Sequence, residues 1–281
     1  MSRMKSSLVI GASRGIGRQI ALTLSSNGYK VGVASKTVQS TEKLPGSIHS
    51  VVDEIVKSGG EAVPIQCNVR KEEDIEKAVQ QCINVFGGLD LAVYNAGAIM
   101  WKKVIDTPLK NFDLMQEVNV RGAYTMLQCV LPHFLQKNSG RIILVSPPIY
   151  NRFFKGKTPY SVGKVGMTVL VHGLANELKG TGVSISALWP AVTVKSFVTE
   201  KMQVPDEMMR SPELFADAVL GIAEEKTDGV TLIDEDYLRT KGVTDFSKYN
   251  CVPDSEPPRI MPKKFPSLLV EEEDVDLSSK L

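Results

Sequence analysis

The sequence lacks an excess of charge of either sign. Its 281 residues include 33 Lys and Arg against 32 Asp and Glu, which leaves a formal net charge of +1. The charged runs are short and mixed, and no basic stripe with interleaved aromatic side chains offers a groove for nucleic acid. We therefore expect no nucleic-acid partner.

Cysteine and histidine are also scarce. The four cysteines, Cys67, Cys82, Cys129 and Cys251, show no C-x-x-C spacing, and the three histidines are isolated from them in the sequence. This pattern excludes a disulfide framework and provides no ligand set for zinc. We interpret the cysteines as reduced thiols of a protein that is not secreted, and we expect no bound metal.

No long hydrophobic run is present either. The first residues lead into a strand candidate without an apolar signal region. The longest mostly apolar stretch, residues 182–194, contains Pro190 and is shorter than the ~20 residues of a membrane helix, so we expect no transmembrane segment. The last three residues, Ser279, Lys280 and Leu281, form the tripeptide that the peroxisomal import receptor reads at a free C-terminus, and they predict a peroxisomal location.

What the sequence does contain is an alternation of short β-branched runs with longer helical patterns. Runs typical of strands lie at 7–10, 30–34, 62–66, 89–94, 141–146, 183–189 and 230–233. Apolar residues at three and four spacing predict helices at 16–25, 48–57, 72–86, 112–135, 160–178 and 212–224. This alternation predicts an α/β fold, a doubly wound, Rossmann-like parallel sheet of about seven strands with helices on both faces.

The length and the fading periodicity predict how the chain is divided. One α/β domain of about this length can bury a single large core, so we predict one such domain over residues 1–250. From about Asp234 the helical pattern gives way to Pro- and charge-rich sequence. We expect residues 251–281 to form an extended surface tail that ends in the targeting signal.

Three glycines mark the junction between the first predicted strand and the first helix. Gly11, Gly15 and Gly17 follow an apolar strand with the spacing G-x-x-x-G-x-G. Glycine lets the backbone turn sharply and approach a pyrophosphate, and the free N–H groups of a helix N-terminus bind anions. The junction therefore predicts a dinucleotide phosphate site.

Tyr160 and Lys164 are spaced one helical turn apart, on one face of the predicted helix. The unperturbed pKa values of both side chains lie near ~10, so neither is useful alone at neutral pH. We expect the Lys164 ammonium and the positive end of the helix to lower the pKa of the Tyr160 phenol. Such a pair predicts a proton donor.

Ser146 ends the fifth predicted strand, which Pro147 and Pro148 terminate. Its hydroxyl is therefore expected at the carboxyl edge of the sheet, where open α/β folds bind ligands. Thr158 and Pro159 are predicted as N-cap and first residue of the next helix. This arrangement predicts that Tyr160 protonates a carbonyl oxygen and that Ser146 is a second hydrogen-bond donor to the same oxygen.

With the glycine turn, Asn95-Ala96-Gly97, Asn119, Ser146 and the Tyr160–Lys164 pair in this order, residues 7–233 resemble the short-chain dehydrogenase/reductase family. Lys36-Thr37, Leu44-Pro45-Gly46 and Trp189-Pro190 resemble a subgroup in which this domain is often followed by a sterol-carrier domain. We expect no such second domain after the dehydrogenase part of this sequence.

The resemblance implies a catalytic set and a nucleotide site. The implied catalytic residues are Ser146, Tyr160, Lys164 and Asn119. The implied nucleotide contacts are Gly11, Ser13, Arg14, Gly15, Ile16, Gly17, Lys36, Asn68, Val69, Asn95, Ala96, Gly97, Tyr160, Lys164 and Val192. By this resemblance Asn119 distorts its helix and holds a water beside Lys164, while Lys164 binds the nicotinamide ribose. Pro190-Ala191 departs from the Pro-Gly usual in the family, and Val192 is the expected nicotinamide contact.

The residues after the second predicted strand bear on the choice of cofactor. Enzymes that use NAD place Asp or Glu there, about 20 residues beyond the glycines, to bond the ribose 2′-hydroxyl. This chain has Ser35-Lys36-Thr37 instead, and Arg14 offers a second cation for a 2′-phosphate. We therefore predict NADP(H), with Asn68 in the place of the Asp that usually contacts adenine in the family.

Three functions are weighed on these residues. The first is an NADP-dependent enzyme that interconverts a carbonyl and a secondary alcohol on a lipid-derived or other hydrophobic substrate. The second is reduction of the C=C bond of an enoyl-CoA, against which Tyr160 argues, since such relatives generally lack that tyrosine. The third is a non-catalytic NADP-binding or scaffold protein, which loss of Tyr160 or Lys164 would have favoured. The helical patterns at 118–135 and 160–178 are apolar nearly all round, which predicts a homodimer or homotetramer.

Overall fold

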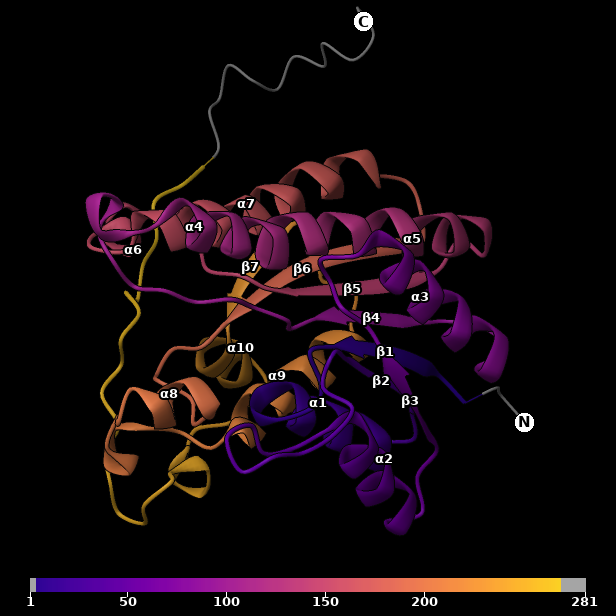
Figure 1. Ribbon diagram of the computed structural model, residues 1–281, viewed down its shortest axis with the longest axis horizontal. Helices are drawn as coiled ribbons and strands as arrows, with labels where there is room; N and C mark the ends of the chain where they lie inside the picture. Colours follow the sequence, from indigo (N-terminus) through magenta and orange to yellow (C-terminus); the bar gives the residue numbers. More distant parts are fainter. Residues whose placement is uncertain (1–3, 269–281) are drawn as a thin grey trace, which may run out of the picture.

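Seven parallel strands form the centre of the protein (Figure 1), as the sequence predicts. The computed structural model describes residues 4–268, so Ser279, Lys280 and Leu281 lie outside the described residues. The strand order is β3-β2-β1-β4-β5-β6-β7, which reverses direction between β1 and β4. The strands are β1 (Ser6–Ile10), β2 (Lys30–Ser35), β3 (Ala62–Gln66), β4 (Leu91–Tyr94), β5 (Gly140–Val145), β6 (Val183–Trp189) and β7 (Val230–Ile233).

Helices cover both faces of the sheet (Figure 1). The helices are α1 (Gly15–Ser26), α2 (Ile48–Lys57), α3 (Glu72–Phe86), α4 (Leu109–Gln116), α5 (Gly122–Gln136), α6 (Asn151–Phe154), α7 (Thr158–Glu177), α8 (Phe197–Lys201), α9 (Pro212–Glu224) and α10 (Asp234–Thr240). α3, α5 and α7 bury one face of the sheet, and α1, α2 and α9 bury the other. Because both faces are covered, β1 and β4 are buried at every residue.

The predicted helix at 112–135 is interrupted. A π-helical turn, Glu117–Arg121, separates α4 from α5. The short helices α6, α8 and α10 were not predicted, because a few residues show too little periodicity to reveal a helix. The chain after β7 therefore forms α10 first, whereas the sequence predicts that the helical pattern ends at about Asp234.

The segment after α10 runs along one edge of the molecule, past α8 and α6 (Figure 1). Arg259 pairs with Val192 in an isolated antiparallel bridge, and Met261 is only 5% exposed. Residues 259–261 therefore lie against the domain core and complete part of its surface.

The described residues were also searched for membrane-spanning helices, metal sites and disulfides. No helix between residues 4 and 268 is long and apolar enough to cross a membrane. Within the same residues, no group of three or more His, Cys, Asp or Glu side chains could hold a metal ion. All four cysteines are free thiols.

Candidate functional site

Ser146 and the predicted nucleotide contacts outside α7 follow the carboxyl ends of strands, so the fold brings them to one edge of the sheet. The glycine turn follows β1, Lys36 follows β2, and Asn68 and Val69 follow β3. Asn95, Ala96 and Gly97 follow β4, Ser146 follows β5, and Val192 follows β6. Since the strand order reverses between β1 and β4, this edge contains the crevice in which doubly wound folds bind ligands.

The loop that follows β4 packs tightly against the glycine turn. Gly11 has φ +91°, and a Cβ there would lie 2.6 Å from the backbone nitrogen of Ala96. A Cβ on Gly17 would collide with the carbonyl oxygen of Gly11. The side-chain amide of Asn95 donates to that same carbonyl at 3.0 Å. Only glycine fits these positions, so the backbone of the turn stays open to a ligand.

The first turn of α1 offers uncapped N–H groups. The helix begins at Gly15 with Arg14 as N-cap residue, and no side chain accepts from its first turn. Free N–H groups and the positive end of a helix favour an anion. The turn from Gly11 to Gly17 therefore fits a pyrophosphate.

Arg14 is held by the loop that follows β2. Its Nε donates to the carbonyl oxygen of Pro45 at 2.8 Å, and its Nη2 donates to that of Gly46 at 3.0 Å. The guanidinium also lies 5.6 Å from the ring centroid of Phe197, and burial lowers its pKa. Lys36, by contrast, is exposed. Arg14 thus fixes the 45–46 loop beside the nucleotide site, and Lys36 is the cation that faces solvent there.

Asn119 lies inside the π-helical turn and is fully buried. Its side chain forms two hydrogen bonds with Ala98, accepting from the N–H at 2.9 Å and donating to the carbonyl at 3.0 Å. The Tyr94 hydroxyl donates to the carbonyl of Val118 at 2.6 Å. A π-helical turn disturbs the regular bonding of a helix, and these two contacts bond polar groups of the turn to β4 and its loop. The distortion expected at Asn119 is therefore present.

Gly97 is the point at which Asn119 and Lys164 meet. A Cβ on Gly97 would lie 3.5 Å from Oδ1 of Asn119 and 3.6 Å from Nζ of Lys164. Nζ of Lys164 donates to the carbonyl of Val145, the last residue of β5, at 2.8 Å. The three residues predicted from separate motifs are therefore neighbours.

Tyr160 and Lys164 are both buried in α7, at 4% exposure each. Among the described residues, no hydrogen bond joins the Tyr160 hydroxyl to Lys164 or to Ser146. Burial raises the pKa of Tyr160 and lowers the pKa of Lys164 to about 7. The direction of this Tyr160 shift is opposite to the lowering expected from Lys164, because burial disfavours the charged phenolate.

Ser146 is fully buried and is oriented by a residue that the sequence did not reveal. Oγ1 of Thr168, one turn beyond Lys164 on α7, lies 2.9 Å from Oγ of Ser146 and 2.6 Å from the carbonyl oxygen of Pro147. The two contacts compete for the single hydroxyl proton of Thr168. Thr168 therefore couples Ser146 to the helix that carries Tyr160.

The N-terminus of α7 differs from the prediction by one residue. The helix begins at Thr158, its N-cap residue is Lys157, and no side chain caps it. The Thr158 hydroxyl donates back to the carbonyl of Phe154 at 3.3 Å, so it is not the expected cap. Tyr160 still lies in the first turn.

Aromatic rings surround Tyr160. The Trp101 and Phe153 ring centroids lie 6.5 Å and 6.4 Å from that of Tyr160. Trp189, at the end of β6, lies 5.7 Å from the Phe153 centroid, and Nζ of Lys164 lies 5.7 Å from the Trp189 ring. Trp189 was not predicted here, although the last residue of a central strand lies at the ligand edge by rule.

Of the five residues that the sequence predicts at the substrate, Trp101, Phe153, Phe154, Phe197 and Met202, three lie in the aromatic cluster around Tyr160. Phe197 packs beside Arg14 and Lys201, near the glycine turn, and Met202 is 41% exposed. Trp101 and Phe153 contact Tyr160, and Phe154 packs against the same cluster.

The loop after β6, where the nicotinamide contact is expected, is held by the last part of the described chain. Oδ1 of Asp234 accepts from the N–H of Ala191 at 2.8 Å, and the carbonyl of Ala191 accepts from Ile260 at 2.8 Å and Met261 at 3.2 Å. Val192 is 2% exposed and packs with Ala191 and Met261. The loop is thus buried between α10 and the C-terminal segment.

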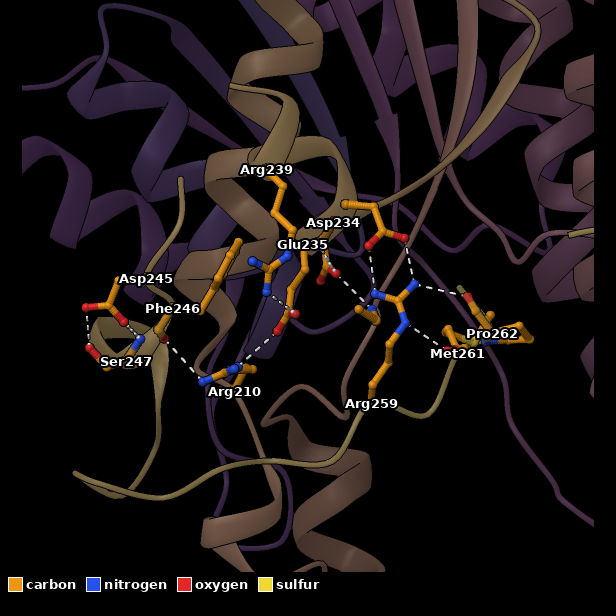
Figure 2. A network of polar contacts seen from close by, with 12 residues as sticks. Arg210, Asp234, Glu235, Arg239, Asp245, Phe246, Ser247, Arg259, Met261 and Pro262 are labelled. Carbon is orange, nitrogen blue, oxygen red and sulfur yellow. Dashed lines mark hydrogen bonds and ion pairs between the residues drawn. The ribbon is translucent and has the colours of Figure 1, made fainter. Parts of the chain in front are cut away.

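Figure 2 shows the ion pairs that tie this segment down. Arg259 forms a two-bond ion pair with Asp236, at 2.7 and 2.6 Å, and also donates to the carbonyls of Met261 and Pro262. Arg210 binds Glu235 at 3.1 Å and the carbonyl of Phe246 at 3.2 Å (Figure 2). The carboxylates of α10 therefore organise both the C-terminal segment and the loop after β6.

Known proteins are similar to this chain in sequence and in fold. Residues 5–205 match the short chain dehydrogenase family. Hydroxysteroid dehydrogenase-like protein 2 from Danio rerio is 37% identical over 251 residues, and that from Homo sapiens is 36% identical over the same length. Each alignment covers 87% of this chain and 60% of the relative, so the chain spans less than two thirds of these curated relatives.

Two solved structures are similar over nearly the whole chain. A putative dehydrogenase from Xanthomonas campestris is 36% identical with a TM-score of 0.87, and the match covers 94% of this chain and all of that one. A short chain dehydrogenase from Mycobacterium thermoresistibile is 37% identical with a TM-score of 0.85, covering 91% of this chain and 93% of that one.

The chain belongs to the short-chain dehydrogenase/reductase family, whose members are oxidoreductases that use a nicotinamide nucleotide. The resemblance to this family that the sequence predicts is confirmed. The subgroup inferred from residues 36–37, 44–46 and 189–190 is the one to which hydroxysteroid dehydrogenase-like protein 2 belongs. The uncapped turn at Gly11 to Gly17 fits the phosphates of such a nucleotide.

Proposed function

We propose that this oxidoreductase reduces a carbonyl group to a secondary alcohol on a hydrophobic, lipid-derived substrate, with Tyr160 as the proton donor. The observation that carries the proposal is the position of Tyr160. Tyr160 lies in the first turn of α7, at the same sheet edge as the glycine turn and one helical turn before Lys164, whose Nζ lies beside Gly97. Burial raises the pKa of Tyr160, so the phenol keeps its proton at neutral pH. A protonated phenol is suited to donate to a carbonyl oxygen.

The remaining residues have supporting roles. The nicotinamide nucleotide supplies hydride when bound. Ser146 is the second hydrogen-bond donor to the carbonyl oxygen, which stabilises the charge that develops there. Lys164 binds the nucleotide ribose, and Asn119, whose side chain is fixed by Ala98, holds the neighbouring loop in place.

We further propose a preference for NADP(H). No carboxylate follows β2, where an enzyme specific for NAD has one. Lys36 is exposed at that place, whereas Arg14 already donates to the carbonyls of Pro45 and Gly46. The proposal therefore rests on Lys36 as the charged contact for the 2′-phosphate, with Arg14 shaping the loop around it.

The surroundings of Tyr160 support a hydrophobic substrate. Trp101, Phe153, Trp189 and Tyr150 form an aromatic wall, of which Trp101 and Phe153 contact the ring of Tyr160. Trp101 is 52% exposed, so part of this wall is open to an incoming molecule. Aromatic walls with few polar groups are typical of sites for apolar ligands.

The test is a screen of NADPH oxidation against 3-oxoacyl-CoAs, steroids, quinones and short aldehydes. Wild-type protein is expected to consume NADPH with at least one of these carbonyls, and Tyr160→Phe is expected to lose turnover while it still binds NADPH. Retained carbonyl reduction by Tyr160→Phe would refute the role of the phenol. Reduction of an enoyl-CoA alone would favour the C=C reductase alternative, and nucleotide binding without any turnover would favour a binding protein.

We also propose a homodimer or homotetramer built on α5 and α7. Tyr124, Val162 and Val169 are 49%, 52% and 57% exposed on the outer sides of these helices. Exposed apolar residues gathered on neighbouring helices are typical of a subunit interface. Sedimentation at micromolar concentration tests this, and a monomer would contradict it.

Peroxisomal import through Ser279, Lys280 and Leu281 is likewise our proposal. A fluorescent protein fused in front of the native C-terminus is expected to enter peroxisomes, and the same fusion without Leu281 is expected to stay outside.

A further inference from the structure

Lys157 is a cation held between two rings of the aromatic wall. Its Nζ lies 4.3 Å from the Phe153 ring centroid and 4.9 Å from that of Trp101. Both rings also contact Tyr160, at 6.4 and 6.5 Å between centroids. The ammonium and the phenol are therefore separated by a single layer of aromatic side chains.

This ammonium lacks the anionic partner that other partly buried lysines have. Lys30 pairs with Glu61 at 2.9 Å, and Lys137 pairs with Asp90 at 2.6 Å. For Lys157, no hydrogen bond or ion pair to Nζ occurs within residues 4–268, and burial lowers its pKa. Ring faces attract a cation but do not replace a hydrogen-bond acceptor. An ammonium that is partly removed from water is stabilised further when an anion binds it.

The two chain segments that supply these aromatic rings carry positive charge alone. Residues 147–176 and 91–105 contain no Asp or Glu, whereas they contain six lysines and arginines: Lys102, Lys103, Arg152, Lys155, Lys157 and Lys164. Arg152 and Lys155 line an open hollow of about 550 Å³ on α6 and the start of α7. The uncapped first turn of α7 adds the positive end of a helix. These segments therefore favour an anion over a cation.

We propose that Lys157 binds an anionic group, a carboxylate or a phosphate, on the substrate whose carbonyl reacts at Tyr160. This inference rests on the proposed carbonyl reduction. Trp101 and Phe153 contact the hydrocarbon between the two groups, and Lys157 binds the charged end. The substrate class is thus an apolar carbonyl compound that carries an acid group or is linked to a phosphate-bearing carrier.

The experiment compares two aldehydes that differ only in charge, 4-carboxybenzaldehyde and methyl 4-formylbenzoate, with NADPH. The ester activates the aldehyde more strongly than the carboxylate does, so a preference for the acid reports binding. Wild-type protein is expected to show at least a tenfold higher kcat/KM for the acid. Lys157→Met is expected to lower kcat/KM for the acid by about 10- to 100-fold and for the ester by less than about twofold, since a charge-assisted bond is lost.

Two control variants separate binding from charge and folding. Lys157→Arg keeps the charge and is expected to retain most of the preference. Lys179→Met, an exposed lysine beyond the other end of α7, makes the same change in net charge and is expected to act like wild type. Acetoacetyl-CoA forms the phosphate arm, and a loss confined to it in Lys157→Met would identify the phosphate-bearing carrier as the anion source. Equal rates for acid and ester in wild type, with no loss for acetoacetyl-CoA in Lys157→Met, would overturn the inference.

A binding arm keeps this inference distinct from the proposed function. The alcohols 4-(hydroxymethyl)benzoate and its methyl ester are titrated into the protein with NADPH present, and binding is followed by fluorescence of Trp101 in a Trp189→Phe background. Selective binding of the acid that Lys157→Met abolishes supports the inference even if no carbonyl is reduced. If carbonyls are reduced but Lys157→Met affects acid and ester alike in both arms, the inference fails and the proposed function stands.

Discussion

Oδ1 of Asp234 accepts from the N–H of Ala191 at 2.8 Å and from the N–H of Glu235 at 2.7 Å, while its Oδ2 has no hydrogen-bond partner among the described residues. One carboxylate therefore joins the loop after β6 to the start of α10. The side chain is fully buried, and burial raises its pKa to about 7. An ionised carboxylate with one unpartnered oxygen is a costly support for a ligand-binding loop.

The first prediction concerns the pH dependence of stability. The folded protein binds a proton at Asp234 up to about pH 7, whereas the unfolded chain releases it near ~3.9, so the free energy of unfolding falls as pH rises through this window. The slope from this group is at most about 1.4 kcal/mol per pH unit. Denaturant unfolding between about pH 5 and about pH 8 should show a smaller pH dependence for Asp234→Asn than for wild type. Asp53→Asn on the surface of α2 is the matched control; an identical slope in Asp234→Asn and wild type would contradict the prediction.

A second prediction concerns the stability cost of Lys164. Its pKa falls from 10.5 to about 7 in the folded protein, so the unfolded state binds more protons between these values and stability rises with pH there. Below about pH 7 the buried ammonium costs the fold its full penalty. Lys164→Met should therefore be more stable than wild type by a few kcal/mol near pH 6, although turnover is lost.

Calorimetric unfolding of Lys164→Met and of Lys110→Met, an exposed control on α4, measures this effect. The stabilisation should shrink as pH is raised toward ~10, because wild type then loses its penalty. A Lys164→Met protein that is less stable than wild type at every pH would show that the bond to Val145 outweighs desolvation.

Thr168 should position Ser146. Thr168→Val keeps the shape of the side chain but removes the hydroxyl within 2.9 Å of Oγ of Ser146. We expect kcat to fall about 3- to 10-fold, the affinity for NADPH to stay unchanged, and stability to fall by about 1–2 kcal/mol because the carbonyl of Pro147 loses its donor. Thr125→Val is the control, since Thr125 is a buried threonine of α5 that bonds a helix carbonyl at 3.0 Å. Should both variants keep full kcat, Thr168 has no positioning role.

The pair between Arg259 and Asp236 should hold the C-terminal segment against the loop after β6. Arg259→Met removes two bonds to the carboxylate and two to backbone carbonyls, so we expect a loss of about 1–3 kcal/mol in stability and a raised KM with a smaller change in kcat. Arg259→Lys should recover little, because an ammonium cannot reproduce the two-bond geometry. Lys5→Met breaks an exposed ion pair with Glu224 and should cost less than about 1 kcal/mol.

The cofactor preference should depend on Lys36. NADPH is expected to bind at least about tenfold more tightly than NADH, and Lys36→Asp should reverse that order. Lys43→Asp changes the charge of the same loop at an exposed residue and should leave the ratio near that of wild type. Equal dissociation constants of wild-type protein for NADPH and NADH would contradict the preference.

Much of the fold was accessible from sequence because its elements are long and regular. α2, α3, α9, β3, β6 and β7 were predicted to the residue, since their apolar periods are uninterrupted. The π-helical turn at Asn119 was expected only from the family resemblance and not from the apolar period, which a single inserted residue hardly changes. α10 was missed because its first turn, Asp234 to Asp236, is acidic and carries no apolar period.

The candidate site, too, was predictable from the sequence only in part. The sequence by itself determined which residue types reach the ligand edge, because most of the motifs directly follow a strand and parallel strands end at one edge. Only the tertiary structure decided their state. Burial and distant chain segments decide that Lys164 donates to the carbonyl of Val145. They also decide that Arg14 donates to the carbonyls of Pro45 and Gly46. Pairing of Lys157 with two rings and of Asp234 with Ala191 has the same origin, since desolvation and long-range contacts leave no trace in local spacing.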